Sequence, residues 1–318
     1  MLVGGGTATG LALAQSAPVG SGVVVINVRS SYGAGAGTGM VLTSSGEVLT
    51  NNHVIEGASS IRVVVPQTGK RYTAKVVGYD VTHDVALLQM QGAPNLKAVT
   101  VGDSASLKVG QKVTAKGNAG GTGSLTTTSG KVTALARSIT VQDDNGGSSR
   151  LTGLIETDAN LQPGDSGGPL LDSAGRVIGM DAAGEVGHGY GLQADQSSDG
   201  YAIPIGRAIS IVKQIEAGRA SSTVHVGETA YLGVVVTDQA DGTGAAIAAV
   251  MPDEPAAAAG LTAGDVITAI AGHSVTTASQ LGSLLLRQSA GAHVTVSYQD
   301  QLGQSQTATV TLGSGPAQ

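Results

Sequence analysis

The sequence contains no cysteine, phenylalanine or tryptophan, and only 13% of its 318 residues are charged. Without cysteine the chain has no disulfide framework, no thiolate zinc site and no cysteine nucleophile. Its six histidines form no His-Glu-x-x-His motif and no other close pair at metal spacing. We therefore expect neither a structural metal nor a cofactor, and a core built from Val, Leu, Ile and Ala.

Basic residues are also scarce, with 17 Lys and Arg against 23 Asp and Glu, which gives a net charge of −6. The sequence has no basic tract that could follow a phosphate backbone, so we expect no nucleic-acid partner. The length is sufficient for two or three domains.

The N-terminus, residues 1–15, is uncharged and apolar and ends in the small-x-small sequence Ala12-Leu13-Ala14. This pattern is typical of the later part of a secretory signal peptide, although the charged first part is missing. Residues 1–21 are thus either a signal-peptide remnant or a disordered tail. The first interpretation predicts a secreted, periplasmic or cell-envelope protein, whose membrane association, if any, is through this segment alone.

Short Val-, Ile- and Thr-rich runs broken by Gly, Asn, Asp and Ser fill the chain up to about Pro204. Many short strands without intervening helical periods predict an all-β sandwich or β-barrels. A helix is expected at 205–216, where Ile205, Ile209, Val212 and Ile215 share one face. The expected strands are 23–28, 39–43, 61–65, 72–77, 85–90 and 131–135.

The helix closes a first domain at 22–217, and the small, polar residues 218–228 are predicted to form a linker. Residues 229–318 alternate strand patterns with two helical stretches, 254–260 and 277–288. This second unit is large enough for a small mixed α/β domain.

One stretch of the first domain, Gly164–Pro169, places Ser166 between glycines. A tight glycine turn can expose a serine hydroxyl together with backbone N–H groups, as a nucleophile requires, but it can equally be an ordinary hairpin. A serine nucleophile needs an imidazole to take its proton and a carboxylate to orient that imidazole.

His53, just after an apolar run, and Asp84, at the start of another, are candidates for these two roles. The alternatives are that His53 is a surface or satisfied core residue and that Asp84 caps a turn. Asp80 and His83 are nearby competitors. His83 is a poor partner for Asp84, because neighbours in an extended segment point to opposite faces.

Three segments, Thr50–Val54, His83–Leu88 and Gly164–Pro169, resemble in order and spacing the HtrA/DegP family of trypsin-like serine proteases, especially the single-PDZ members of the bacterial cell envelope. The resemblance implies a mainly β protein with two six-stranded, chymotrypsin-like β-barrels and the active site between them. It also implies a catalytic triad of His53 as general base, Asp84 as orienting residue and Ser166 as nucleophile.

The resemblance further implies an oxyanion hole made by the N–H groups of Gly164 and Ser166, with Asp165 between them. Asn160 stands where trypsin carries a carboxylate, so small aliphatic P1 residues are expected. Asp181 replaces the Asn common in HtrA proteins, and a side chain turned into the pocket would instead favour a polar or basic residue. The implied pocket consists of Asn160, Leu161, Met180, Asp181, Ala182 and Ala183.

The second unit resembles a PDZ domain in two segments, Tyr231-Leu232-Gly233-Val234 and Gly260–Ile267. The first looks like a carboxylate-binding loop, which implies that residues 229–318 bind peptide C-termini by strand addition. Taken alone, the tetrapeptide favours an ordinary strand start, and the accompanying segment Gly260–Ile267 shifts the interpretation to a PDZ domain.

The family resemblance implies an ATP-independent endopeptidase that cleaves unfolded or damaged proteins through an acyl-enzyme. It also implies a homotrimer, although the N-terminal aromatics usual at such contacts are reduced here to Tyr32. The alternative is a proteolytically silent, chaperone-like peptide-binding protein of the same architecture, acting in protein quality control.

Overall fold

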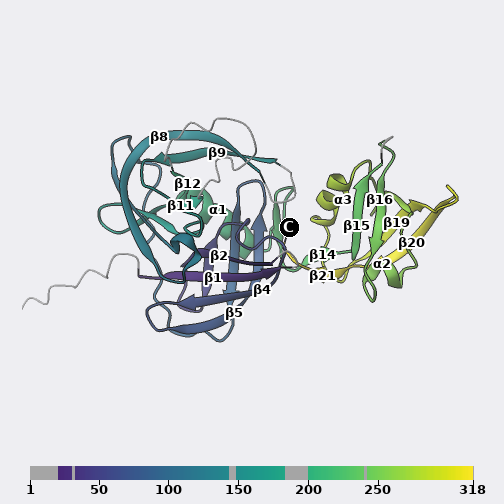
Figure 1. The fold of residues 1–318 in the computed structure, drawn as a ribbon, viewed down its shortest axis with the longest axis horizontal. Helices are drawn as coiled ribbons and strands as arrows, with labels where there is room; N and C mark the ends of the chain where they lie inside the picture. The colour runs from purple at the N-terminus through teal and green to yellow at the C-terminus, as the bar shows by residue number, and fades with distance from the viewer. Residues whose placement is uncertain (1–20, 31–32, 143–147, 183–199, 240–241, 318) are drawn as a thin grey trace, which may run out of the picture.

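A computed structural model describes residues 21–30, 33–142, 148–182, 200–239 and 242–317. Its larger, N-terminal part is built from strands and one long helix, and its smaller, C-terminal part is a separate α/β lobe (Figure 1). Three hydrophobic clusters lie in the N-terminal domain and a fourth lies in the C-terminal domain.

The first barrel consists of six antiparallel strands in the order β5-β4-β1-β2-β3-β6, closed by pairing of β5 with β6. Alternate residues such as Val24, Ile26 and Leu88 point inward and are fully buried. The strands are β1 (Val23–Ser30), β2 (Gly33–Val41), β3 (Glu47–Thr50), β4 (Ala58–Val65), β5 (Lys70–Asp80) and β6 (Val85–Met90).

The second barrel is also closed and six-stranded, in the order β10-β11-β12-β9-β8-β7. Together the two barrels confirm the predicted architecture of the first domain. The strands are β7 (Lys112–Gly117), β8 (Thr126–Gln142), β9 (Ser148–Thr157), β10 (Pro169–Leu171), β11 (Val177–Ala182) and β12 (Gly200–Pro204), and the 3-10 helix η1 (Ala119–Gly121) follows β7.

Helix α1 (Ile205–Glu216) has the predicted bounds and packs where the two barrels meet. Its buried face consists of Ile205, Ala208, Ile211, Val212 and Ile215. Ile209, which the sequence assigns to that face, packs against the same cluster but is only partly buried, whereas Ala208 and Ile211 are buried. The cluster around α1 takes side chains from both barrels and so fixes their relative placement.

A seventh strand, β13 (Val224–Val226), lies in the range predicted as a linker and pairs antiparallel with the end of β5. Val224 lies opposite Asp80 and His225 lies opposite Tyr79. The connection between the two domains is therefore part of the first sheet in this structure.

The C-terminal domain has a sheet in the order β15-β16-β17-β19-β20, with β18 beside β17, and a separate two-stranded sheet of β14 and β21. Both helices fall within the predicted stretches. The elements are β14 (Thr229–Tyr231), β15 (Val234–Asp238), β16 (Ala245–Val250), α2 (Pro255–Ala258), β17 (Val266–Ile270), β18 (His273–Ser274), α3 (Ala278–Leu285), β19 (His293–Gln299), β20 (Ser305–Thr311) and β21 (Gly313–Gly315).

The two domains contact each other through polar and apolar groups around β5 and β13. The ring of His225 lies against Tyr79, and its Nδ1 lies 2.8 Å from the carbonyl oxygen of Leu286, just after α3. Ala317 packs into the core cluster of the first barrel, and its carbonyl oxygen accepts a 2.8 Å hydrogen bond from the Gly57 N–H. The end of the described chain thus returns to the N-terminal domain.

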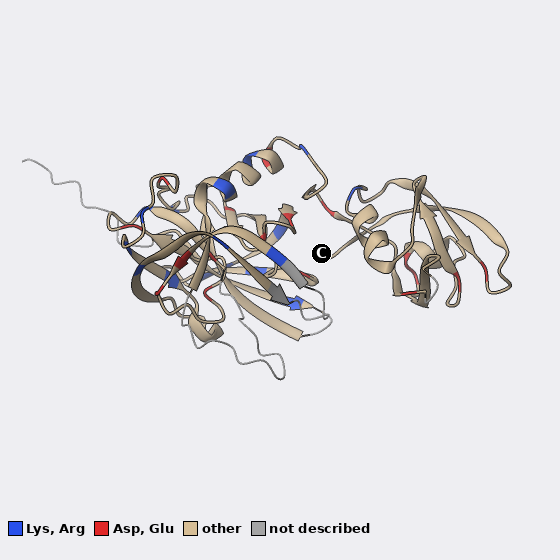
Figure 2. Cartoon of the chain, turned by 90° about the horizontal axis from the view of Figure 1, so that it is seen from above, with Lys and Arg blue, Asp and Glu red and all other residues tan. Residues whose placement is uncertain are grey.

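Charged residues are spread over the N-terminal domain, with both signs interspersed (Figure 2). The C-terminal range 229–318 instead holds six acidic residues and a single basic one, Arg287. None of the helices in the described ranges combines the length and the apolar character that crossing a membrane requires.

We expect Leu88→Ala to destabilise the N-terminal domain by about 2–5 kcal/mol, because Leu88 is fully buried in the first barrel and its truncation leaves a cavity. Leu135→Ala, at a half-exposed position of β8, is the matched control and should cost less than about 1 kcal/mol. Differential scanning calorimetry of both variants measures the effect, and equal melting temperatures would contradict the assigned core.

Candidate active site

His53 and Asp84 form a two-point contact at the edge of the first barrel. Asp84 Oδ1 accepts a 2.9 Å hydrogen bond from the His53 backbone N–H, and Oδ2 lies 2.8 Å from His53 Nδ1. A carboxylate can only accept, so this contact places the ring proton on Nδ1 and leaves Nε2 of the neutral imidazole as the basic nitrogen. Asp84 is buried, whereas 46% of the His53 side chain is exposed.

Asp84 lies in the four-residue connection between β5 and β6 and has a left-handed backbone, with φ of 54°. This conformation is uncommon for a residue other than glycine and turns the carboxylate away from the direction of the strand. The Asn51 side chain donates a 3.0 Å hydrogen bond to the Asp84 carbonyl oxygen. Asn51 therefore helps to hold Asp84 in place.

Ser166 lies on the nucleophile loop, residues 160–168, which precedes β10 of the second barrel. Thr38 of β2 connects this loop to the first barrel: its N–H donates to the Ser166 carbonyl oxygen (2.9 Å) and its Oγ1 to that of Gly164 (2.7 Å). A Cβ built on Gly37 would meet both Val54 and the Ser166 carbonyl oxygen. Ser166 therefore lies beside the segment that carries His53, at the junction of the barrels.

Some backbone N–H groups of the nucleophile loop donate hydrogen bonds within the protein and others do not. Those of Gln162, Asp165, Gly167 and Gly168 donate to acceptors within the protein. Among the described residues, those of Gly164 and Ser166 find no acceptor. The N–H of Asp165, which was placed between them in the predicted oxyanion hole, donates to the Gln162 carbonyl oxygen.

Two positions of this loop require glycine. Gly164 and Gly167 have φ of 96° and 84°, in the region that L side chains rarely adopt. A Cβ would also lie 2.3 Å from the Asn118 carbonyl oxygen at Gly164 and 2.1 Å from the Thr38 carbonyl oxygen at Gly167. The glycines thus allow the loop to pack tightly between the barrels.

The predicted pocket residues separate into two groups. Asn160 is exposed and Leu161 is half-buried on the nucleophile loop, and Asn160 Oδ1 accepts a 2.7 Å hydrogen bond from Gln162 Nε2. Met180, Asp181 and Ala182 are buried on β11, and Ala183 lies outside the described residues.

Asp181 is fully buried, and its two carboxyl oxygens have no hydrogen-bond partner among the described residues. Its backbone is bonded to the nucleophile loop, since its carbonyl oxygen accepts from the Gly167 N–H (2.8 Å) and its N–H donates to the Gly168 carbonyl oxygen (2.7 Å). Burial, and secondly the charge of Asp165, raise the pKa of Asp181 well above its ordinary value. Burial also raises the pKa of Asp165, although the Gln162 N–H opposes this.

The two competitors considered for the triad, His83 and Asp80, bond to each other rather than to His53 or Asp84. His83 Nδ1 lies 2.9 Å from Asp80 Oδ2. Sequence reasoning did not identify Thr38 or Asn51 as residues of the site. The position of Thr38 between two glycines and that of Asn51 two residues before His53 were the available signals.

We expect Asp181→Asn to stabilise the fold at pH 8 and to have no such effect at pH 4. The folded-state pKa lies above the roughly 3.9 of an unfolded aspartate, so folding takes up a proton. The stability that this carboxyl contributes is full below about pH 4 and is lost as pH rises toward the folded-state pKa. Asparagine has a similar shape and does not ionise.

Urea unfolding followed by circular dichroism measures this difference, with an expected gain at pH 8 on the order of 1 kcal/mol or more. Glu216→Gln, at an exposed position of α1, is the control and should change little at either pH. A gain of equal size at both pH values would show that Asp181 does not titrate in this range.

Comparisons with known proteins agree with this architecture. Residues 37–180 match the trypsin-like peptidase domain and residues 230–312 match the PDZ domain. Serine protease PepD of Mycobacterium tuberculosis is 33% identical over 288 residues, 87% of this chain and 60% of the relative. Periplasmic serine endoprotease DegP of Salmonella typhimurium is 34% identical over 303 residues, which are 88% of this chain and 60% of the relative.

This chain thus spans about three fifths of the length of these relatives. Among solved structures, the HtrA-type protease AlgW with a tripeptide matches with a TM-score of 0.53 and 28% identity, over 93% of this chain and 94% of that chain. The chain, with a trypsin-like peptidase domain followed by a PDZ domain, belongs to the HtrA/DegP family.

Proposed function

We propose that the protein is a serine endopeptidase with Ser166 as nucleophile, His53 as general base and Asp84 as the orienting carboxylate. One observation supports this most strongly. The His53–Asp84 contact lies beside a serine whose own N–H, together with that of Gly164, has no acceptor among the described residues. A base, a nucleophile and two free donors are the parts that acyl transfer needs.

In this mechanism His53 Nε2 takes the Ser166 proton as Oγ attacks the substrate carbonyl carbon. The N–H groups of Gly164 and Ser166 donate to the oxyanion, an interaction whose loss at one donor typically costs about 10²–10³ in rate. His53 then gives its proton to the leaving amine, which forms the acyl-enzyme. Water, activated by the same imidazole, releases the acyl group, while Asp84 stabilises the imidazolium throughout.

The pocket favours small aliphatic P1 residues. Asp181 is fully buried, and its raised pKa favours the neutral carboxyl, so it supports no preference for a basic side chain. Leu161 and Met180 are apolar, and Asn160 adds no charge. A cleavage profile dominated by Lys or Arg at P1 would contradict this assignment.

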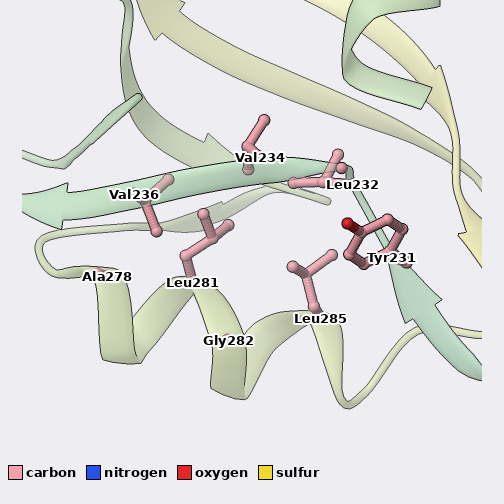
Figure 3. Close-up of a pocket in the computed structure, with 9 residues that line it drawn as sticks. Tyr231, Leu232, Val234, Val236, Ala278, Leu281, Gly282 and Leu285 are labelled. Carbon is pink, nitrogen blue, oxygen red and sulfur yellow. The ribbon is translucent and has the colours of Figure 1, made fainter. Parts of the chain in front are cut away.

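A second site is proposed in the C-terminal domain, where a groove of about 140 Å³ runs between β15 and α3 (Figure 3). We name it the PDZ groove. In Figure 3 the side chains of Val236 on the strand and Leu281 on the helix point toward each other across it. Its lining residues are Tyr231, Leu232, Gly233, Val234, Val236, Ala278, Leu281, Gly282 and Leu285.

The backbone around the PDZ groove suits an added peptide strand. Strand β15 is at the edge of its sheet, so one side of it is free to pair. The N–H groups of Leu232 and Gly233 have no acceptor among the described residues and could bind a terminal carboxylate. Gly233 has φ of 78°, and a Cβ there would lie 2.3 Å from Glu254 Cβ, so this loop requires glycine.

The charge of the C-terminal domain indicates which tails would bind. A peptide that adds antiparallel to β15 with its carboxylate at Gly233 would run toward Asp238, at the far end of the strand. With six acidic residues against one arginine in 229–318, upstream basic residues are favoured. We infer that the groove takes tails with an apolar last residue and a Lys or Arg several positions before it.

The broader biological assignment follows the relatives, several of which are named as periplasmic serine endoproteases. We propose a cell-envelope or secreted protein, organised as a homotrimer, that cleaves unfolded or damaged proteins without ATP. Any membrane association is assigned to the N-terminal segment, residues 1–21. That segment lies almost wholly outside the described residues, as does Tyr32.

We expect Ser166→Ala and His53→Ala each to reduce casein cleavage to about the same residual level, because the members of a triad act as a unit. His273→Ala, at an exposed position of the C-terminal domain, is the control and should keep full activity. Covalent labelling of the wild type by a fluorophosphonate separates the endopeptidase from the proteolytically silent alternative. No labelling would favour the silent protein.

We expect Leu281→Lys to weaken binding of a peptide with an apolar C-terminal residue by tenfold or more, since it puts a charge in the apolar groove. Ser283→Lys lies on the same helix outside the groove and is the matched control. Fluorescence anisotropy with free-acid and amidated versions of one peptide measures both effects. Equal affinity for the two versions would argue against carboxylate recognition at Leu232 and Gly233.

A further inference from the structure

A second His–Asp pair lies next to the proposed catalytic one and repeats its geometry. Asp80 Oδ1 accepts a 2.9 Å hydrogen bond from the His83 backbone N–H, and Asp80 Oδ2 lies 2.9 Å from His83 Nδ1. The Asp80 side chain is 1% exposed. The proposed mechanism assigns no role to this pair, although His83 immediately precedes Asp84 in the chain.

The contacts of Asp80 fix the connection that carries Asp84. Asp80 is the last residue of β5 and lies opposite Val85, the first residue of β6. Between them, residues 81–84 must reverse the chain and end in the left-handed backbone of Asp84. A non-glycine residue in that conformation is disfavoured by roughly 1–2 kcal/mol, so the surrounding contacts must hold it.

Asp80 also contacts the segment between the two domains. Its Oδ2 accepts a 3.1 Å hydrogen bond from the Thr223 hydroxyl, immediately before β13. The register of β13 then places Val224 opposite Asp80. One buried carboxylate thus joins the connection that carries Asp84 to the strand that leads to the C-terminal domain.

We propose that Asp80 is a positioning residue for the catalytic carboxylate, and that Thr223 contributes to this role from the interdomain segment. Asp80 acts through the backbone of the connection: it holds His83, and His83 fixes the residue that follows it. Misplacement of a catalytic group by about 1 Å can cost 10²-fold in rate. This inference rests on the proposed function, because it assumes that Asp84 orients His53.

The test uses four variants of the full chain. Asp80→Asn keeps the size of the side chain but removes its charge and one acceptor oxygen. Thr223→Val replaces the hydroxyl by a methyl group, and Thr223→Ser keeps the hydroxyl but lacks the methyl group. Lys75→Ala is the control, because it breaks a different side-chain contact between β5 and the interdomain segment, an exposed 3.8 Å ion pair with Glu228.

Steady-state cleavage of a short peptide and the rate of fluorophosphonate labelling are measured for each variant, with the folded fraction determined by circular dichroism. We expect kcat and the labelling rate to fall together, about tenfold or more in Asp80→Asn and several-fold in Thr223→Val, with KM within about twofold. Thr223→Ser and Lys75→Ala should match the wild type. Thr223→Val remains decisive if Asp80→Asn fails to fold.

The low-field proton NMR resonance of the His53 ring N–H gives a readout that does not need activity. We expect it to shift or broaden in Asp80→Asn and Thr223→Val and to be unchanged in Lys75→Ala. Folded variants with wild-type labelling rates and an unchanged resonance would overturn the positioning role. A wild type that is not labelled would contradict the proposed function alone, because the resonance still tests the positioning of Asp84.

Discussion

Thr38 is the residue at which the two barrels are joined around the site. It is fully buried, and all its polar groups are used: the N–H and hydroxyl donate to Ser166 and Gly164, the hydroxyl accepts from the Asn118 N–H, and the carbonyl oxygen accepts from Thr50 Oγ1. Each unmade bond in such a place would cost the desolvation of a buried polar group. Thr38 thus binds the nucleophile loop to the first barrel through both its backbone and its side chain.

The many short strand patterns predicted an all-β sandwich or barrels, and the family resemblance implied two six-stranded barrels. Helix α1 was predictable because its apolar residues recur with a helical period. The helical period could not show that Ala208 and Ile211 are buried in the α1 contact while Ile209 is only partly buried. That outcome depends on where the two barrels place their own side chains. Strand β13 was missed for a related reason, because Val224-His225-Val226 is too short and too polar in context to stand out from a linker.

Candidate site residues could be predicted where the chemistry allows only a few residue types. They could not be predicted where packing determines which way a side chain points and what it contacts. Ser166, His53 and Asp84 were candidates because acyl transfer needs these groups and because their segments resemble those of the family, and the structure places His53 against Asp84. The burial of Asp181 could not be read from its neighbours, since a strand next to a pocket can face either way. The sequence also could not identify Asp80 as the partner of His83. The alternation of side chains in an extended segment indicated only that His83 does not pair with Asp84.

Strand β13 (Val224–Val226) belongs to the sheet of the N-terminal domain, although the sequence predicts that this domain ends at residue 217. Residues 78–80 of β5 use one side to bond β6 and the other to bond β13. A chain that ends at Ala217 would leave the second side as an open strand edge, the kind along which proteins associate into aggregates. The shortest unit that pairs residues 78–80 of β5 on both sides therefore extends to Val226, nine residues beyond Ala217.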